Sequence, residues 1–309
     1  MSIIQAWISG LRRGLAQPGM TLWLYVLNLL VALPLAMACR SVLSDGLDGS
    51  MALSNLMAGL DYTVWQDFSN VHGQELSAAM GQLLWVILLS MLLSTFLSGG
   101  ILSELRAGRE KFSTSSFFAG CGTYFSRFFR LFLIFGVSLL VMATLLVVVL
   151  SAAGDALTEN AASEITYIWV RGISVVIFLV PVMLLLMIAD YAKLSVVVNN
   201  DRSMLKTAWR AMQFVLRRVF KTFGLELSML LVPVVLFGVY LILDLSIGMT
   251  TGATILVMFI LQQLFLFSRA WTKVFFFAGE LALYQSLQPI ASPVVEAGSG
   301  PPEMETVHV

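Results

Sequence analysis

Six long apolar stretches constrain this chain more than any other feature of its sequence. Each is about as long as a helix that crosses a bilayer core of roughly 30 Å, and continuous apolar runs of that length predict helices rather than a barrel. They cover residues 21–39, 79–101, 130–151, 166–189, 223–244 and 253–276. We therefore predict an all-α polytopic membrane protein with six transmembrane helices.

The composition agrees with this prediction. Hydrophobic residues make up 59% of the chain and charged residues only 12%, and the mean hydropathy is +0.89. These values lie outside the range of soluble domains. An integral membrane protein is the class that the composition supports.

Charge alternates between the segments that connect the spans, and this predicts the orientation of the chain. Lys and Arg gather in residues 1–20, 102–130 and 190–222, whereas acidic residues dominate 40–78 and 152–165. Segments retained in the cytoplasm carry an excess of Lys and Arg. We therefore expect a multi-pass protein of a cell membrane, the bacterial inner membrane, with both termini in the cytoplasm.

Three parts follow from the pattern along the chain. Residues 1–20 are expected to form a cytoplasmic amphipathic helix, residues 21–287 the six-helix transmembrane domain, and residues 288–309, rich in Pro and Gly, a disordered cytoplasmic tail. A weak repeat of about 90 residues adds detail, because similar residues recur at that spacing. The matched pairs are Ser113 with Ser203, Arg127 with Arg217, and Ser138 with Ser228. The repeat predicts three hairpins of two spans, each preceded by an amphipathic interfacial helix.

The segment 203–221 is the sharpest local pattern in the chain. Apolar residues recur at helical spacing opposite polar ones, and the bases of the segment are Lys206, Arg210, Arg217, Arg218 and Lys221. A basic amphipathic helix before a span lies in the headgroup layer, so these bases are candidates for contact with anionic lipid on the cytoplasmic face or with a protein partner. The plainer alternative is an anchor that only keeps this segment inside the cell.

Charged and amide side chains inside the spans are the candidates for a functional site, because polar groups in the membrane are costly. Glu226 lies near the start of the fifth span, and Arg269 and Lys273 lie near the end of the sixth. We predict an ion pair between Glu226 and Arg269, either as a structural link or as part of an ion relay. Gln262 and Gln263 lie nearer the middle of the bilayer and either line a polar cavity or join helices by hydrogen bonds.

Signals for catalysis, cofactors and nucleic acid are absent from the sequence. The two cysteines and two histidines form no zinc pattern, and no Walker A motif, GxSxG elbow or dinucleotide fingerprint is present. We therefore expect no metal, no cofactor and no nucleic-acid partner, and a protein that is not an enzyme. In the second span, Ser90, Ser94 and Ser98 lead to Gly99 and Gly100, a ridge of small residues that favours close helix packing.

The stretch Asp190-Tyr191-Ala192-Lys193 and the connector that ends at Arg217-Arg218 resemble those of uncharacterised bacterial membrane proteins with six helices. Some of these are similar to the membrane domain found beside glycerophosphodiester phosphodiesterases. The resemblance implies a non-catalytic membrane module. Our first hypothesis is a membrane subunit or scaffold of a transport or envelope assembly. The alternatives are a carrier of a small solute or ion with a polar site near Glu226, Arg269 and Gln262, and an intramembrane lipid enzyme.

Overall fold

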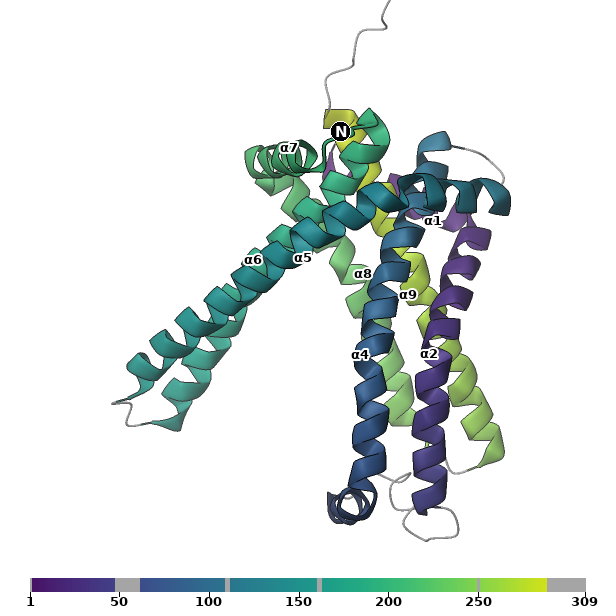
Figure 1. Ribbon diagram of the computed structural model, residues 1–309, viewed down its shortest axis with the longest axis vertical. Helices are drawn as coiled ribbons and strands as arrows, with labels where there is room; N and C mark the ends of the chain where they lie inside the picture. The colour runs from purple at the N-terminus through teal and green to yellow at the C-terminus, as the bar shows by residue number, and fades with distance from the viewer. Residues whose placement is uncertain (1, 48–61, 109–111, 160–162, 249–250, 288–309) are drawn as a thin grey trace, which may run out of the picture.

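The computed structural model describes residues 2–47, 62–108, 112–159, 163–248 and 251–287. Within these ranges the chain forms eight helices and no strands (Figure 1). They are α1 (Ile3–Ala16), α2 (Pro18–Leu47), α4 (Tyr62–Ala107), α5 (Thr114–Thr158), α6 (Glu164–Asn199), α7 (Met204–Arg217), α8 (Val219–Ser246) and α9 (Gly252–Leu287). All except α1 and α7 are long and apolar enough to cross a membrane, which confirms the all-α polytopic fold. The predicted tail at 288–309 lies outside the described residues.

The helices are longer than the apolar stretches that predict them. The returning helix α9, for example, continues eleven residues beyond the expected end of the sixth span at residue 276. Helix α5 joins the aromatic segment after Ser113 and the third span into one continuous helix. An apolar run marks only the part of a helix that faces lipid, whereas a helix continues for as long as its backbone hydrogen bonds are kept and its side chains pack.

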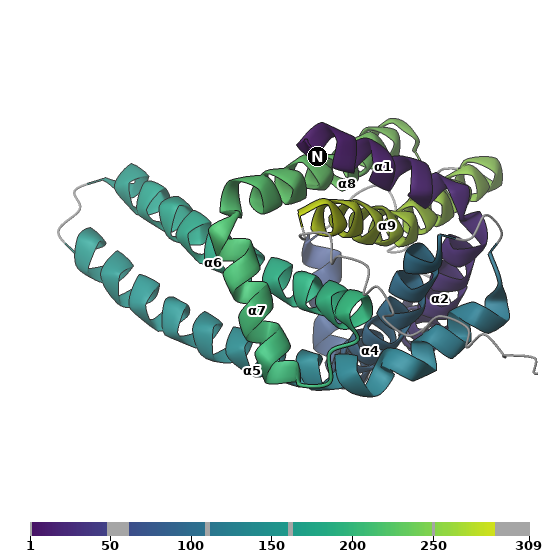
Figure 2. The ribbon, with the colours of Figure 1, turned by 90° about the horizontal axis from the view of Figure 1, so that it is seen from above.

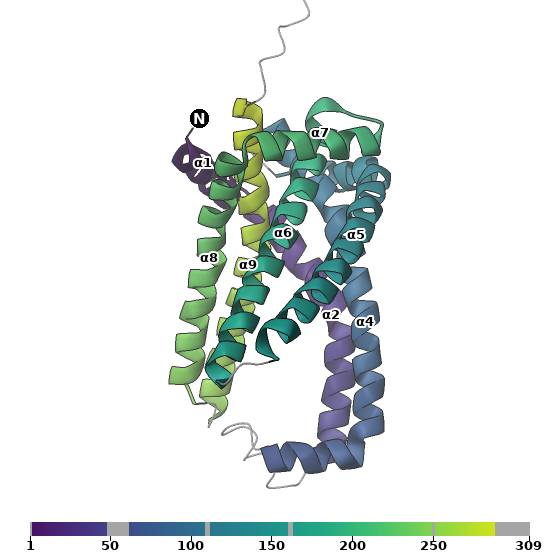
Figure 3. The same ribbon diagram turned by 90° about the vertical axis from the view of Figure 1, so that its left-hand side faces the viewer.

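One end of the molecule, here called the basic end, holds the two short helices α1 and α7. Both lie across the spans rather than along them (Figures 2 and 3). The first turns of α5 and the last turns of α4, α6 and α9 meet at the same end (Figure 1). Two arginines join these turns, since Arg106 of α4 donates to the carbonyl of Val197 and Arg127 of α5 donates to Asn200 Oδ1 at 2.6 Å.

The chain consists of three units, and each has an amphipathic segment, a span that leads away from the basic end and a span that returns to it. The three units form a closed ring at the basic end. Each amphipathic segment packs on the returning span of the preceding unit: the start of α5 on α4, α7 on α6, and α1 on α9. The fourth and eighth residues after the serine that precedes each segment are buried in all three units. These residues are Ala6 and Gly10, Phe117 and Cys121, and Thr207 and Ala211.

Small residues let these pairs approach closely. A Cβ built on Gly10 would lie 3.0 Å from the Cα of Gly279 in α9, and a Cβ on Gly100 would lie 2.5 Å from Cys121 Sγ and 2.7 Å from the carbonyl oxygen of Phe117. Helices in a membrane associate by such close packing, because lipid provides no hydrophobic drive between them. The two glycines that end the predicted ridge therefore pack within the chain, against α5, whereas Ser94 of the same ridge contacts Lys273 of α9.

Away from the basic end, the spans separate. The hairpin of α5 and α6 leans away from α2, α4, α8 and α9 (Figure 1). In the most apolar window of each spanning helix, between 0% and 11% of the residues are buried. The buried core of the protein is therefore concentrated at the basic end.

Candidate functional site

A pocket of about 360 Å³ lies between α2, α4 and α9. It combines polar residues from three helices with an apolar flank. The polar lining consists of Tyr25 and Asn28 from α2, Ser94 from α4, and Arg269 and Lys273 from α9. Two of the predicted intramembrane residues, Arg269 and Lys273, are thus brought together with three that the sequence did not single out for this role.

Hydrogen bonds fix part of this lining. The Lys273 ammonium donates to the side-chain oxygen of Ser94 at 2.7 Å and to its backbone carbonyl at 3.2 Å. The hydroxyl of Tyr25 donates to Oε1 of Gln263 at 2.6 Å, one turn along α9 from Phe267, whose ring packs edge-on against that of Tyr25. Gln263 therefore joins α2 to α9, the ordinary role of an amide between membrane helices. Gln262 is partly buried and does not line the pocket.

The charge in the pocket is unbalanced. No carboxylate is among its lining residues, and neither Arg269 nor Lys273 forms an ion pair within the described residues. The Arg269 side chain has no hydrogen-bond partner in that part of the chain either. An anion placed between Arg269 and Lys273 would accept charge-assisted hydrogen bonds from both side chains.

The predicted ion pair between Glu226 and Arg269 is not formed. The carboxylate of Glu226 in α8 lies close to that of Glu280 in α9, and Arg269 faces the pocket at α2 instead. Eleven residues separate Arg269 from Glu280, which corresponds to about 16 Å along a helix. The prediction was wrong because it ended the sixth span at residue 276, and the true extent of α9 brings Glu280 to the depth of Glu226.

Glu226 belongs instead to a buried acidic group at the basic end. Glu280 is 1% exposed, and its oxygens accept no hydrogen bond from a donor in the described residues. Asp190 of α6 lies close to both glutamates and accepts a hydrogen bond of 2.7 Å from Lys193. The sequence contained one signal for this group, the recurrence of Gly100, Asp190 and Glu280 at equal spacing.

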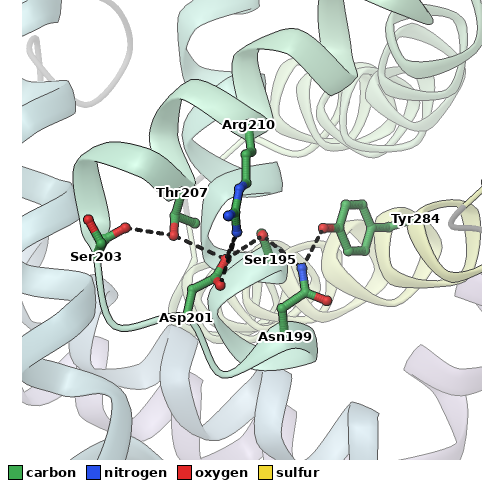
Figure 4. Close-up of polar contacts among 7 residues, drawn as sticks. All are labelled: Ser195, Asn199, Asp201, Ser203, Thr207, Arg210 and Tyr284. Carbon is green, nitrogen blue, oxygen red and sulfur yellow. Dashed lines mark hydrogen bonds and ion pairs between the residues drawn. The ribbon is translucent and has the colours of Figure 1, made fainter. Parts of the chain in front are cut away.

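The corner between α6 and α7 holds one of the bases predicted to contact lipid. The Asp201 carboxylate accepts hydrogen bonds from Thr207 Oγ1 at 3.2 Å and from Arg210 at 3.3 Å (Figure 4). Asn199 bridges this corner to Tyr284 of α9. Arg210 is therefore engaged within the chain, although its side chain is still 62% exposed.

The other bases of this segment divide into two groups. Arg218 donates to the carbonyl of Leu287 at 2.7 Å and lies over the ring of Phe214, so it links α7 to the end of α9. Lys206, Arg217 and Lys221 are exposed.

Helix α7 presents three faces rather than two. Met204, Thr207, Ala211 and Val215 are buried against the protein, whereas Leu205, Trp209 and Leu216 are exposed on a second apolar face. The exposed bases lie on a third face. A helix at a membrane interface needs such a division, because protein, acyl chains and water meet it from different sides.

Among the described residues, no group of three or more His, Cys, Asp or Glu side chains could hold a metal ion. Cys39 and Cys121 are both free thiols. No family model, curated protein or solved structure matches this chain.

Proposed function

We propose that this integral membrane protein is a carrier-type, non-enzymatic protein that holds a small solute or a lipid headgroup in the pocket between α2, α4 and α9. The observation that supports this proposal is the convergence of five polar side chains from three helices on one pocket, within helices whose apolar windows are almost entirely exposed. Ligand sites in membrane proteins are built in this way, with polar residues facing a cavity in the bundle.

The proposed orientation places the basic end in the cytoplasm of a bacterial cell. The basic segments of the sequence meet at this end, as the positive-inside rule requires of the retained side. We further propose that Lys206 and Arg217 of α7 and Lys221 at the start of α8 contact anionic headgroups there, with Trp209 at the boundary of the acyl chains.

A second candidate is a membrane subunit or scaffold, and the hairpin of α5 and α6 favours it. This hairpin leans away from the other spans, and large apolar side chains such as Leu140 and Ile168 are exposed on it (Figure 1). A partner protein in the membrane would find an accessible surface on this hairpin. Mild detergent extraction followed by mass spectrometry distinguishes the two candidates, because a scaffold retains a stoichiometric protein partner.

The accessibility of a cysteine tests the pocket itself. In a background with Cys39→Ser and Cys121→Ala, we expect the Asn28→Cys variant to react with a membrane-impermeant thiol reagent, because a hydrated thiol ionises and reacts. Leu140→Cys is the control, since its side chain is 68% exposed on the lipid-facing part of α5 and its thiol stays protonated there. An Asn28→Cys variant that resists the reagent from both sides of the membrane would contradict the proposal.

A further inference from the structure

The pocket between α2, α4 and α9 contains two cations and no carboxylate, which restricts the chemistry of its ligand. An anion would gain charge-assisted hydrogen bonds from these two basic side chains, which a neutral or cationic solute would not. The charges of the lining residues therefore favour an anion as the ligand.

The donors in the pocket suit a phosphate group in particular. Arg269 offers a planar fork of N–H donors with no partner in the described residues, and this fork matches the oxygens of a phosphate. Lys273 adds a point charge, and its hydrogen bonds to Ser94 hold the ammonium at the pocket wall. The guanidinium of Arg269 and the ammonium of Lys273 together could bind a phosphate that has two or three accessible oxygens.

The position of the pocket points to the level of lipid headgroups. Helix α1 crosses α9 along the stretch that includes Trp271 and Gly279, since a Cβ on Gly14 would lie 3.2 Å from Trp271 Nε1. Arg269 and Lys273 lie on the same helix, within about one turn of Trp271. The pocket therefore lies at the same level of α9 as the crossing with α1, on a different face of the helix.

The rest of the lining is apolar and open to the bilayer. Leu29 and Leu266 flank the pocket and are 39% and 41% exposed. An acyl chain could leave the pocket along these residues without burying a polar group. A phospholipid could place its phosphate at the basic side chains and its acyl chains along the apolar flank. A free phosphate would contact only the basic side chains.

We infer that the pocket binds a phosphate group through Arg269 and Lys273, with an anionic phospholipid as the source that the apolar flank favours. This inference rests on the proposed function, because it names the ligand of the same pocket. Arg269 and Lys273 are the binding residues, and Tyr25, Asn28 and Ser94 position them or complete the lining.

The experiment measures lipid retained by the purified full-length protein after reconstitution in nanodiscs of phosphatidylcholine and phosphatidylglycerol, by native mass spectrometry. We expect the wild type to retain phosphatidylglycerol and Arg269→Gln to weaken this retention about tenfold, the usual effect of losing a charge-assisted hydrogen bond. Arg269→Lys keeps the charge and should recover part of the affinity. Because the Arg269 side chain has no partner in the described residues, these changes should leave folding intact.

Arg171→Gln is the matched control, since Arg171 also lies in a span but pairs with Asp155 at the far end of α6. Its lipid retention should equal that of the wild type. Equal retention in wild type and Arg269→Gln, together with no thermal stabilisation of the wild type by inorganic phosphate, would overturn the inference. Stabilisation by inorganic phosphate that depends on Arg269, without retained lipid, would support the phosphate site and assign it to a soluble anion.

The cysteine experiment separates the two proposals. A reactive Asn28→Cys thiol combined with lipid retention that ignores Arg269 overturns only the phosphate inference. A thiol that stays unreactive after bound lipid has been removed with detergent overturns the pocket as a ligand site and the phosphate inference with it.

Discussion

The two ends of this protein are built differently, although the same helices run through both. At the basic end, the last turns of α4, α6 and α9 pack with α1, α7 and the start of α5, and side chains such as Phe117, Phe128 and Tyr191 are fully buried. Towards the other end, residues of the same helices, such as Leu140 of α5 and Ile168 of α6, face outwards. The hairpin of α5 and α6 shows the contrast most clearly, since its base is packed and its tip is not (Figure 1).

This difference indicates where the fold is specified. Apolar surface gains little from helix association in lipid, so the outer halves of the spans need no tight contacts. At the basic end, the arrangement of the helices is fixed by packed side chains, by small residues where helices cross, and by hydrogen bonds and ion pairs. Two substitutions in the same helix, one at the basic end and one in the outer half, should therefore differ in their effect on stability.

The largest difference is expected for two leucines of α5. Leu131 is 1% exposed at the basic end, and Leu140 is 68% exposed nine residues later. Leu131→Ala should lower the free energy of unfolding in detergent by about 3 kcal/mol, because it leaves a cavity in a packed core. Leu140→Ala should change it by less than about 0.5 kcal/mol. Equal losses in denaturant titrations would show that the outer half of α5 is packed as tightly as its base.

Two glycines of α4 give the next difference. A Cβ on Gly100 would meet Cys121 and Phe117 at less than 3.0 Å, whereas nothing lies within 4 Å of a Cβ on Gly81. Gly100→Ala should cost about 2 kcal/mol because α5 must move away from α4. Gly81→Ala should leave stability unchanged or raise it slightly, since alanine favours the helix. Thermal unfolding of the two variants checks this, and a tolerated Gly100→Ala would argue against the close crossing.

The smallest difference concerns two cations in α6. Lys193 pairs with Asp190 at the buried acidic group, and its ammonium lies near the ring of Phe277. Lys193→Gln should cost about 1 kcal/mol, because it leaves the neighbouring carboxylates without their nearest cation. Arg171→Gln removes an exposed pair with Asp155 and should have an effect near zero. Raised salt should reduce any effect of Arg171→Gln and leave that of Lys193→Gln largely unchanged.

Much of the fold could be predicted from the sequence, because membrane spans depend on local composition. The six apolar runs lie within the six long helices, and the short helices α1 and α7 lie within the segments predicted to be amphipathic, 1–20 and 203–221. The second segment does not form one helix, because α7 ends at Arg217 and Lys221 belongs to α8. The ends of the spans were less predictable. Helices α6 and α9 continue at the basic end because residues such as Tyr191 and Tyr284 pack against neighbouring helices. Nothing in a local window of the sequence indicates which helix that neighbour is.

The candidate site could be predicted only in part. The sequence identified Arg269 and Lys273 because charges inside a span are rare, but it gave Arg269 the wrong partner. Tyr25 and Asn28 are ordinary residues of an apolar stretch until α2 lies against α9, and Ser94 was predicted as a packing residue. Glu280 lies beyond residue 276, where the predicted span ends, so its position beside Glu226 was missed.

By itself, the sequence determined that this chain is a six-span helical membrane protein with its bases gathered in three segments. The physical reason is that lipid requires each span to satisfy its own backbone hydrogen bonds, so length and hydropathy specify the span locally. Only the tertiary structure decided which buried charges meet, that the three amphipathic segments close a ring, and that Arg269 and Lys273 share a pocket without a carboxylate. Those contacts join residues far apart in the chain, and their geometry depends on how helices of particular shapes pack together.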